Sequence, residues 1–88
     1  MKILKVKRLN NKSNIIGKNI KQYRLANNYT QEELCLKLNL YNLNLYHSDI
    51  YLIEHNKRVV RDYEILAFSK VFNITLDDLY SGTAKELE

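Results

Sequence analysis

The sequence predicts a compact all-α domain, and three observations lead to that prediction. The chain has 88 residues, which is enough for one small domain. It contains no Pro and only two Gly, and 45% of its residues are hydrophobic, a composition that favours helices over a disordered chain or a sandwich of strands. Apolar residues also recur at helical spacing along the chain. We therefore expect several short helices around one core.

The first helix is expected over residues 14–27. Ile16, Ile20 and Tyr23 lie at i, i+4 and i+7, so they share one face of that helix. Small polar residues that can cap or end a helix flank the segment: Ser13, Asn14, Asn27 and Asn28. Residues 1–13 precede it as a basic leader without a helical period, and we expect them to form a flexible arm.

The second helix is expected to start after Thr30, because Thr30 and Glu33 form a capping-box pattern. Leu34 and Leu38 mark its inward face, and it should continue to about Tyr41. Cys35 lies beside that face and is expected to be a small buried hydrophobe rather than a redox or ligand residue.

The third helix is expected over residues 47–55, after a turn at residues 43–45 that is rich in Leu and Asn. The alternation in the turn also allows a short strand, which would have no evident partner. Tyr46 is a poor helix cap, so Ser48 could cap the helix instead and start it later. Two apolar residues mark the inward face, Ile50 and Ile53.

The fourth and fifth helices complete a domain that should span residues 14–81. The fourth is expected over residues 62–72 with Asp62 as its cap. Its buried stripe is expected to consist of Ile65, Ser69 and Phe72. Two apolar residues, Leu66 and Phe68, lie beside that stripe. Thr75 and Asp78 form a second capping box for the short fifth helix. Residues 82–88 read as a polar tail.

Charge is unevenly distributed along a chain whose formal net charge is +4. Eight cations and no acid precede Glu32: Lys2, Lys5, Lys7, Arg8, Lys12, Lys18, Lys21 and Arg24. A basic end suits a polyanion, although a plain solvated surface would look the same. Cys35 is the only Cys, so no intramolecular disulfide can form. With no long apolar span or signal peptide pattern either, we expect a cytoplasmic protein without a membrane partner.

Taken in order, these features resemble the lambda-repressor-like, Cro/XRE-type helix-turn-helix domains. The resemblance covers about residues 15–80. The residues that carry it are Ile16-Gly17, Ile20, Tyr23-Arg24, Thr30-Gln31-Glu32-Glu33-Leu34, Ile50, Ile53-Glu54, Lys57-Arg58, Leu66, Phe72 and Ile74-Thr75-Leu76-Asp77-Asp78-Leu79-Tyr80. The stretch between Leu38 and Ile50 is longer than the family's usual turn. In this respect the chain resembles a variant group of the family that has a longer linker. The fold implied is a five-helix DNA-binding domain.

The resemblance implies roles for several residues. Those expected to meet base edges are His47, Ser48, Tyr51 and Leu52. Those expected to contact phosphate are Gln31, His55, Lys57, Arg58 and Arg61. Arg24 and Glu54 match the family's pair that ties the first helix to the end of the third, which we expect to be structural. We expect a homodimer, with a dimerisation surface formed by Leu76, Leu79 and Tyr80.

The expected function is a sequence-specific regulator that binds double-stranded DNA, most simply a repressor that occupies an operator. One alternative is an antitoxin or mobile-element control protein that acts partly through a protein partner. Another is a non-specific nucleic-acid binder, whose affinity would depend on salt but hardly on sequence. The sequence has no Gly-rich phosphate loop or nucleophile elbow, and His47 and His55 are too far apart to pair around a metal. We therefore expect no enzyme activity, metal, cofactor or small-molecule ligand.

Overall fold

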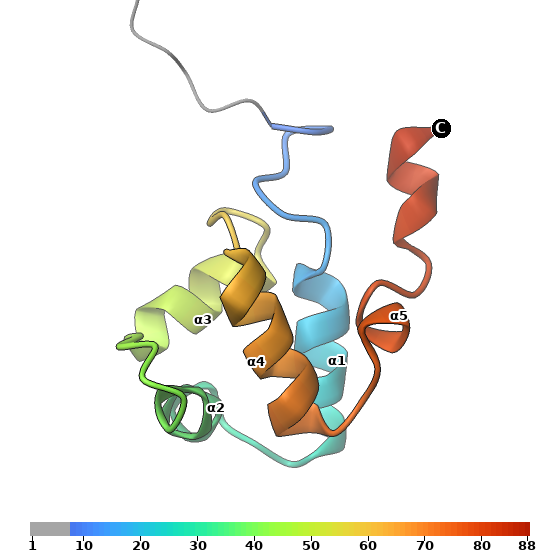
Figure 1. The fold of residues 1–88 in the computed structure, drawn as a ribbon. Coiled ribbons are helices and arrows are strands. Elements are labelled where there is room, and N and C mark those ends of the chain that lie inside the picture. The colour runs from blue at the N-terminus through green and yellow to red at the C-terminus, as the bar shows by residue number, and fades with distance from the viewer. Residues whose placement is uncertain (1–7) are drawn as a thin grey trace, which may run out of the picture.

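Five α-helices and one short 3₁₀ helix make up the computed structural model, which describes residues 8–88 (Figure 1). In chain order they are α1 (Gly17–Ala26), α2 (Gln31–Asn39), α3 (His47–Glu54), α4 (Asp62–Phe72), α5 (Leu76–Leu79) and η1 (Thr83–Leu87). Across residues 8–88 no strand forms, and one isolated bridge joins Leu9 to Lys12. The predicted all-α class is confirmed, and the linker before α3 holds no strand.

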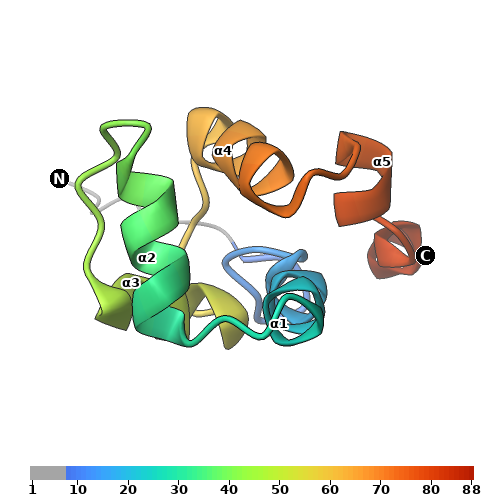
Figure 2. The same cartoon turned by 90° about the horizontal axis from the view of Figure 1, so that it is seen from below.

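One hydrophobic core lies between the helices. α1 and α2 each pack against both α3 and α4, and α5 packs against α4. The buried apolar residues are Ile16, Ile20, Leu34, Cys35, Leu38, Leu45, Ile50, Ile53, Ala67, Phe68, Phe72 and Leu79. Fully burying one large apolar side chain contributes roughly 1.5–3 kcal/mol before entropy is counted. Seen from below, α4 lies on the opposite side of the molecule from α3 (Figure 2).

α1 starts at Gly17, three residues later than the predicted start at residue 14. The side-chain oxygen of Asn14 still serves the helix start, because it accepts hydrogen bonds from the backbone N–H groups of Ile16 (3.1 Å) and Gly17 (2.9 Å). The predicted end is confirmed: Asn28 takes the left-handed conformation, with φ of 58°. Ile16 and Ile20 are buried as predicted, and Tyr23 is half-buried.

α2 begins with the predicted capping box. Thr30 Oγ1 accepts from the backbone N–H of Glu33 at 3.0 Å, and the Glu33 carboxylate accepts from the backbone N–H of Thr30 at 3.1 Å. The helix ends at Asn39 rather than at Tyr41. Leu34, Leu38 and Cys35 are buried, as predicted.

α4 has the predicted bounds but a different cap. Its N-cap is Arg61, and Asp62 is the first helical residue, so the prediction of Asp62 as cap is wrong. Glu64 accepts from the backbone N–H of Arg61 at 2.8 Å. Ser69 and Phe72 are buried as predicted, whereas Leu66 is 50% exposed. Ile65 is only half-buried, and the buried face also includes Glu64, Ala67 and Phe68.

α5 follows the second predicted capping box, in which Thr75 Oγ1 accepts from the backbone N–H of Asp78 at 3.0 Å. Leu79 is fully buried in the core, while Leu76 and Tyr80 are 46% and 37% exposed. Leu79 is therefore not part of a surface, and the expected dimerisation residues are reduced to Leu76 and Tyr80.

The two ends of the described chain contact each other. Lys12 forms an ion pair of 2.7 Å with Glu86 on η1, and the Asn10 amide donates to the backbone oxygen of Glu86 at 2.9 Å. The expected polar tail is thus a short helix, and the last part of the leader is held against it. The rest of the expected arm, residues 1–7, lies outside the described residues. No helix of the described chain is long and apolar enough to cross a membrane.

Candidate nucleic-acid interface

α2 and α3 are held together by the apolar face that each presents to the other. Leu34 and Leu38 on α2 and Ile50 and Ile53 on α3 are all fully buried. Their spacing follows the helical period, so the pairing is a direct consequence of the sequence pattern. The opposite face of α3 is left exposed.

The linker between α2 and α3 is fixed by Asn39. Its side-chain amide donates to the backbone oxygen of Leu45 at 2.8 Å, and its side-chain oxygen accepts from the backbone N–H of Leu45 at 2.7 Å. Asn42 and Asn44 have φ of 63° and 60°, the left-handed conformation that Asn tolerates better than most residues. Leu45 is buried, so the linker enters the core just before α3 begins.

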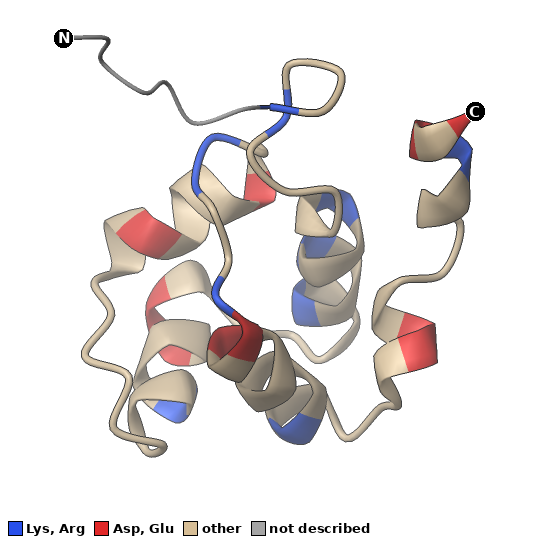
Figure 3. Ribbon diagram, turned by 45° about the horizontal axis from the view of Figure 1, so that its top comes forward, with Lys and Arg blue, Asp and Glu red and all other residues tan. Residues whose placement is uncertain are grey.

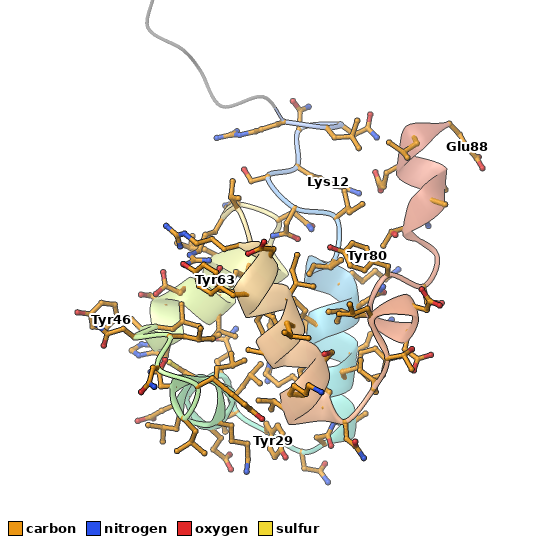
Figure 4. The ribbon with its side chains drawn as sticks, viewed as in Figure 1. Lys12, Tyr29, Tyr46, Tyr63, Tyr80 and Glu88 are labelled. Atoms are coloured by element: carbon orange, nitrogen blue, oxygen red, sulfur yellow. The ribbon has the colours of Figure 1, made fainter. Side chains whose placement is uncertain are left out.

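α3 starts at His47, although Tyr46 supplies no side-chain cap. Instead the Asp49 carboxylate accepts from the backbone N–H of Tyr46 at 2.8 Å. Figure 4 shows Tyr46 projecting outward at this end of the helix. The alternative that Ser48 caps a later helix is wrong.

The exposed face of α3 carries the residues predicted to meet base edges. His47 and Ser48 are exposed in its first turn, and Tyr51 and Leu52 are 47% and 37% exposed one turn later. The Tyr51 ring stacks on His55 with centroids 4.0 Å apart. His55 Nδ1 lies 2.8 Å from the backbone oxygen of Tyr51. One helix face therefore combines hydrogen-bonding groups with an ordered aromatic pair.

Arg24 and Glu54 form the predicted pair, linking α1 to the last residue of α3. Arg24 Nε and Nη2 donate to the two Glu54 carboxylate oxygens at 2.6 and 3.1 Å. The Glu54 side chain is fully buried, and Arg24 Nη1 also donates to the backbone oxygen of Tyr29 at 2.9 Å. Gln31 Nε2 donates to Glu54 at 3.2 Å, so this predicted phosphate contact is tied to the pair from the start of α2.

Two asparagines that were not predicted as site residues hold the other side of α3's C-terminus. The Asn14 side chain donates to the backbone oxygens of Ile53 (3.0 Å) and Arg58 (2.8 Å). The Asn56 side chain donates to the backbone oxygen of Asn14 at 3.0 Å. Gly17 lies against the same segment, where a Cβ atom would overlap the backbone oxygen of Ile53. No single-residue signal in the sequence identifies these contacts, because they depend on segments far apart in the chain.

The predicted phosphate-contacting cations differ in their surroundings. Arg58 donates to both carboxylate oxygens of Glu64 at 2.9 and 3.0 Å, and its Nε lies 3.3 Å from Asp49. Its charge is therefore largely matched by Glu64 and Asp49 within the domain. Lys57 is exposed, and the Arg61 side chain is 58% exposed although it lies 3.6 Å from Glu64. The segment that follows α3 therefore carries three exposed residues predicted to contact phosphate: His55, Lys57 and Arg61.

Two pKa shifts follow from this packing. Burial disfavours the ionised form of Glu64, but the hydrogen bonds and charge of Arg58 and the backbone N–H of Arg61 outweigh it and lower the pKa of this carboxyl. Burial and the nearby Asp49 raise the pKa of the Cys35 thiol, which donates to the backbone oxygen of Leu45 at 3.2 Å. A neutral, hydrogen-bonded Cys35 is a structural residue.

The described residues include no group of three or more His, Cys, Asp or Glu side chains that could hold a metal ion. Comparison of the chain with protein-family models, with curated proteins and with solved structures finds no match. The functional conclusion therefore depends on the geometry of α2, α3 and their surroundings.

Proposed function

We propose that this protein is a sequence-specific regulator that binds double-stranded DNA, with a lambda-repressor-like, Cro/XRE-type helix-turn-helix formed by α2 and α3. In this proposal α3 lies in the major groove, which is wide enough to admit a helix. His47, Ser48 and Tyr51 meet base edges there, and Leu52 meets a thymine methyl group. A protein of this kind most simply represses transcription by occupying an operator.

The observation that carries the proposal is the fixed presentation of α3. Its inner face is buried, its first turn is set by Asn39 and Asp49, and its last residue is held by Arg24. A reading helix must hold its side chains at defined positions relative to the base edges, so this rigid support fits the role. Within residues 8–88 no other element covers this face, which leaves its polar and aromatic side chains exposed.

Phosphate contacts are proposed at both ends of the unit. The N-terminal end of α2, with the remaining hydrogen-bonding groups of Gln31, suits a phosphate oxygen. Lys57, Arg61 and His55 would contact phosphates at the far end of α3. Arg58 instead acts through Glu64 and Asp49, by fixing the loop between α3 and α4.

Selection of bound duplexes from random DNA tests the proposal. A regulator should enrich one motif and bind it about a thousandfold or more tightly than a scrambled duplex of the same length and salt. Affinity without an enriched motif would identify a non-specific nucleic-acid binder, and no affinity for any duplex would favour the antitoxin or partner-dependent alternative. Either result would contradict the proposal.

A further inference from the structure

An apolar groove opens between α4 and the linker that joins α2 to α3. It has a volume of about 510 Å³, and its apolar lining includes Tyr41, Leu43, Tyr63 and Leu66. Tyr41, Tyr63 and Leu66 are 51%, 54% and 50% exposed. Large apolar side chains that gather around a groove, instead of being scattered singly, mark an interaction surface.

The exposed stripe of α4 beside this groove has an acidic residue at one end and a basic residue at the other, so it is complementary in charge to a second, antiparallel copy of the same stripe. Asp62, Leu66 and Lys70 lie at i, i+4 and i+8, so they share one face. Among the described residues neither Asp62 nor Lys70 takes part in an ion pair. Figure 3 shows acid at the first turn of this helix and base at its last turn. Each charge is four residues from Leu66, or about 6 Å along the helix axis.

We propose that a second copy of this chain packs on this surface, with the two α4 helices antiparallel and a two-fold axis at Leu66. Because the charges are equally spaced about Leu66, that axis places Asp62 of each copy opposite Lys70 of the other. Two ion pairs then flank an apolar centre made of the Leu66 and Tyr63 side chains from both copies. A two-fold interface uses the same patch on both subunits, which this pattern satisfies without any further residue.

The proposed interface is separate from the proposed DNA-binding face. α4 lies on the other side of the molecule from α3 (Figure 2), so the exposed face of α3 stays accessible in such a dimer. The inference therefore does not depend on the proposed function, and the two can fail independently. On α5, by contrast, Leu79 is buried, which leaves Leu76 and Tyr80 as its exposed large apolar residues.

Sedimentation equilibrium of the full chain without DNA, together with charge-reversal variants, tests this inference. Asp62→Lys and Lys70→Asp each place like charges opposite each other twice, so each variant alone should dimerise roughly tenfold or more weakly. In an equimolar mixture of the two variants, both pairs between unlike copies become attractive. The mixture should therefore recover an association constant close to that of the unmodified chain.

Two further variants separate the interface from general stability. Leu66→Gln should weaken dimerisation, while Leu25→Gln, at a 54% exposed position on α1, should leave it unchanged. Thermal melts of each variant establish that it is folded. A strict monomer up to about 0.1 mM, a scale that excludes all but very weak association, would overturn the inference. An association constant that is unchanged by Leu66→Gln would also overturn the inference. So would a failure of the two mixed charge variants to associate.

Discussion

At the scale of single residues, the pair formed by Arg24 and Glu54 holds the last residue of α3 against α1. If one member of this bidentate pair is removed, Glu54 keeps only the contact from Gln31, or Arg24 keeps only its hydrogen bond to the backbone oxygen of Tyr29. Such a pair is a stronger anchor than an exposed ion pair, whose two members can return to water. Both residues were predicted from the resemblance to the Cro/XRE-type domains, because they match the pair that ties the first helix to the third in that family.

Glu54→Gln tests the structural role of this pair. Removing the charge leaves the buried Arg24 without its counter-ion, so the free energy of unfolding should fall by about 3–5 kcal/mol. Urea denaturation measures this loss, and Glu32→Gln, on the exposed side of α2, serves as a control that should change little. DNA affinity should fall with stability. Lost affinity at an unchanged free energy of unfolding would mean that Glu54 acts at the interface itself.

Gly17 is the second decisive residue, because α1 approaches the end of α3 closely there. A Cβ atom at Gly17 would overlap the backbone oxygen of Ile53 and lie 2.9 Å from the side-chain amide nitrogen of Asn56. Gly17→Ala should therefore destabilise the domain by about 1–3 kcal/mol, although Ala favours helix more than Gly does. Thermal and urea unfolding check this, with the exposed neighbour variant Lys18→Ala as control. An equal or higher stability would show that α1 and α3 can move apart at no cost.

At the scale of elements, the linker before α3 is ordered by one side chain. Asn39 makes two hydrogen bonds with Leu45, across the five residues that lie between them. The sequence predicted the turn and the helix on either side, but not this contact, since Asn at a helix end is also an ordinary stop signal. The sequence predicted an end at Tyr41 because the next residue, Asn42, is such a stop signal, whereas α2 ends at Asn39.

Asn39→Ala should free the start of α3. Loss of both hydrogen bonds leaves the backbone N–H of Leu45 unpaired at a buried position, and its backbone oxygen keeps only the Cys35 thiol as donor, at a cost of about 1–3 kcal/mol. Hydrogen exchange at the Leu45 amide should accelerate in proportion to that loss, whereas exchange in α4 should follow only global unfolding. Unchanged protection of Leu45 would contradict the role given to Asn39.

The start of α4 gives the molecule a defined dependence on pH. The pKa of Glu64 is lower in the folded chain than in the unfolded one, because Arg58 and Arg61 outweigh the effect of burial. The contribution of this carboxylate is therefore complete above the unfolded pKa, about 4.3, and is lost as the pH falls through the folded pKa.

Glu64→Gln should lower the free energy of unfolding by about 2–3 kcal/mol at neutral pH. The difference from the unmodified chain should shrink as the pH falls below about 4, since protonation removes the same charge. Urea denaturation at a series of pH values provides the measurement, with Glu32→Gln again as control. A difference that stays constant across the series would show that the ion pair with Arg58 does not stabilise the fold.

At the scale of the whole molecule, the helix order and most inward residues followed from the sequence. Contacts between distant segments did not, with the exception of the pair formed by Arg24 and Glu54. Capping boxes at Thr30 and Thr75 and the periodic apolar residues are local signals that survive in the fold. The neutralisation of Arg58 and the docking of Lys12 on Glu86 involve residues brought together only by folding. A charged residue's availability for a ligand depends on such contacts, so part of the predicted interface needed correction.

The molecule has two surfaces with different characters. The exposed face of α3 is polar and aromatic, and the proposed dimer surface on α4 is apolar with one charge at each end. Variants on one surface should leave the other function intact, because different helices carry them.

The central claim, that the exposed face of α3 reads DNA sequence, is tested most directly by one ratio. This is the affinity for the selected duplex divided by the affinity for a scrambled one, at the same salt concentration. For a folded variant that combines His47→Ala, Ser48→Ala and Tyr51→Ala, the ratio should fall by about a hundredfold or more, since each lost base contact costs roughly 1–3 kcal/mol. Affinity for the scrambled duplex should hardly change. A ratio that stays the same would place sequence recognition elsewhere and contradict the account.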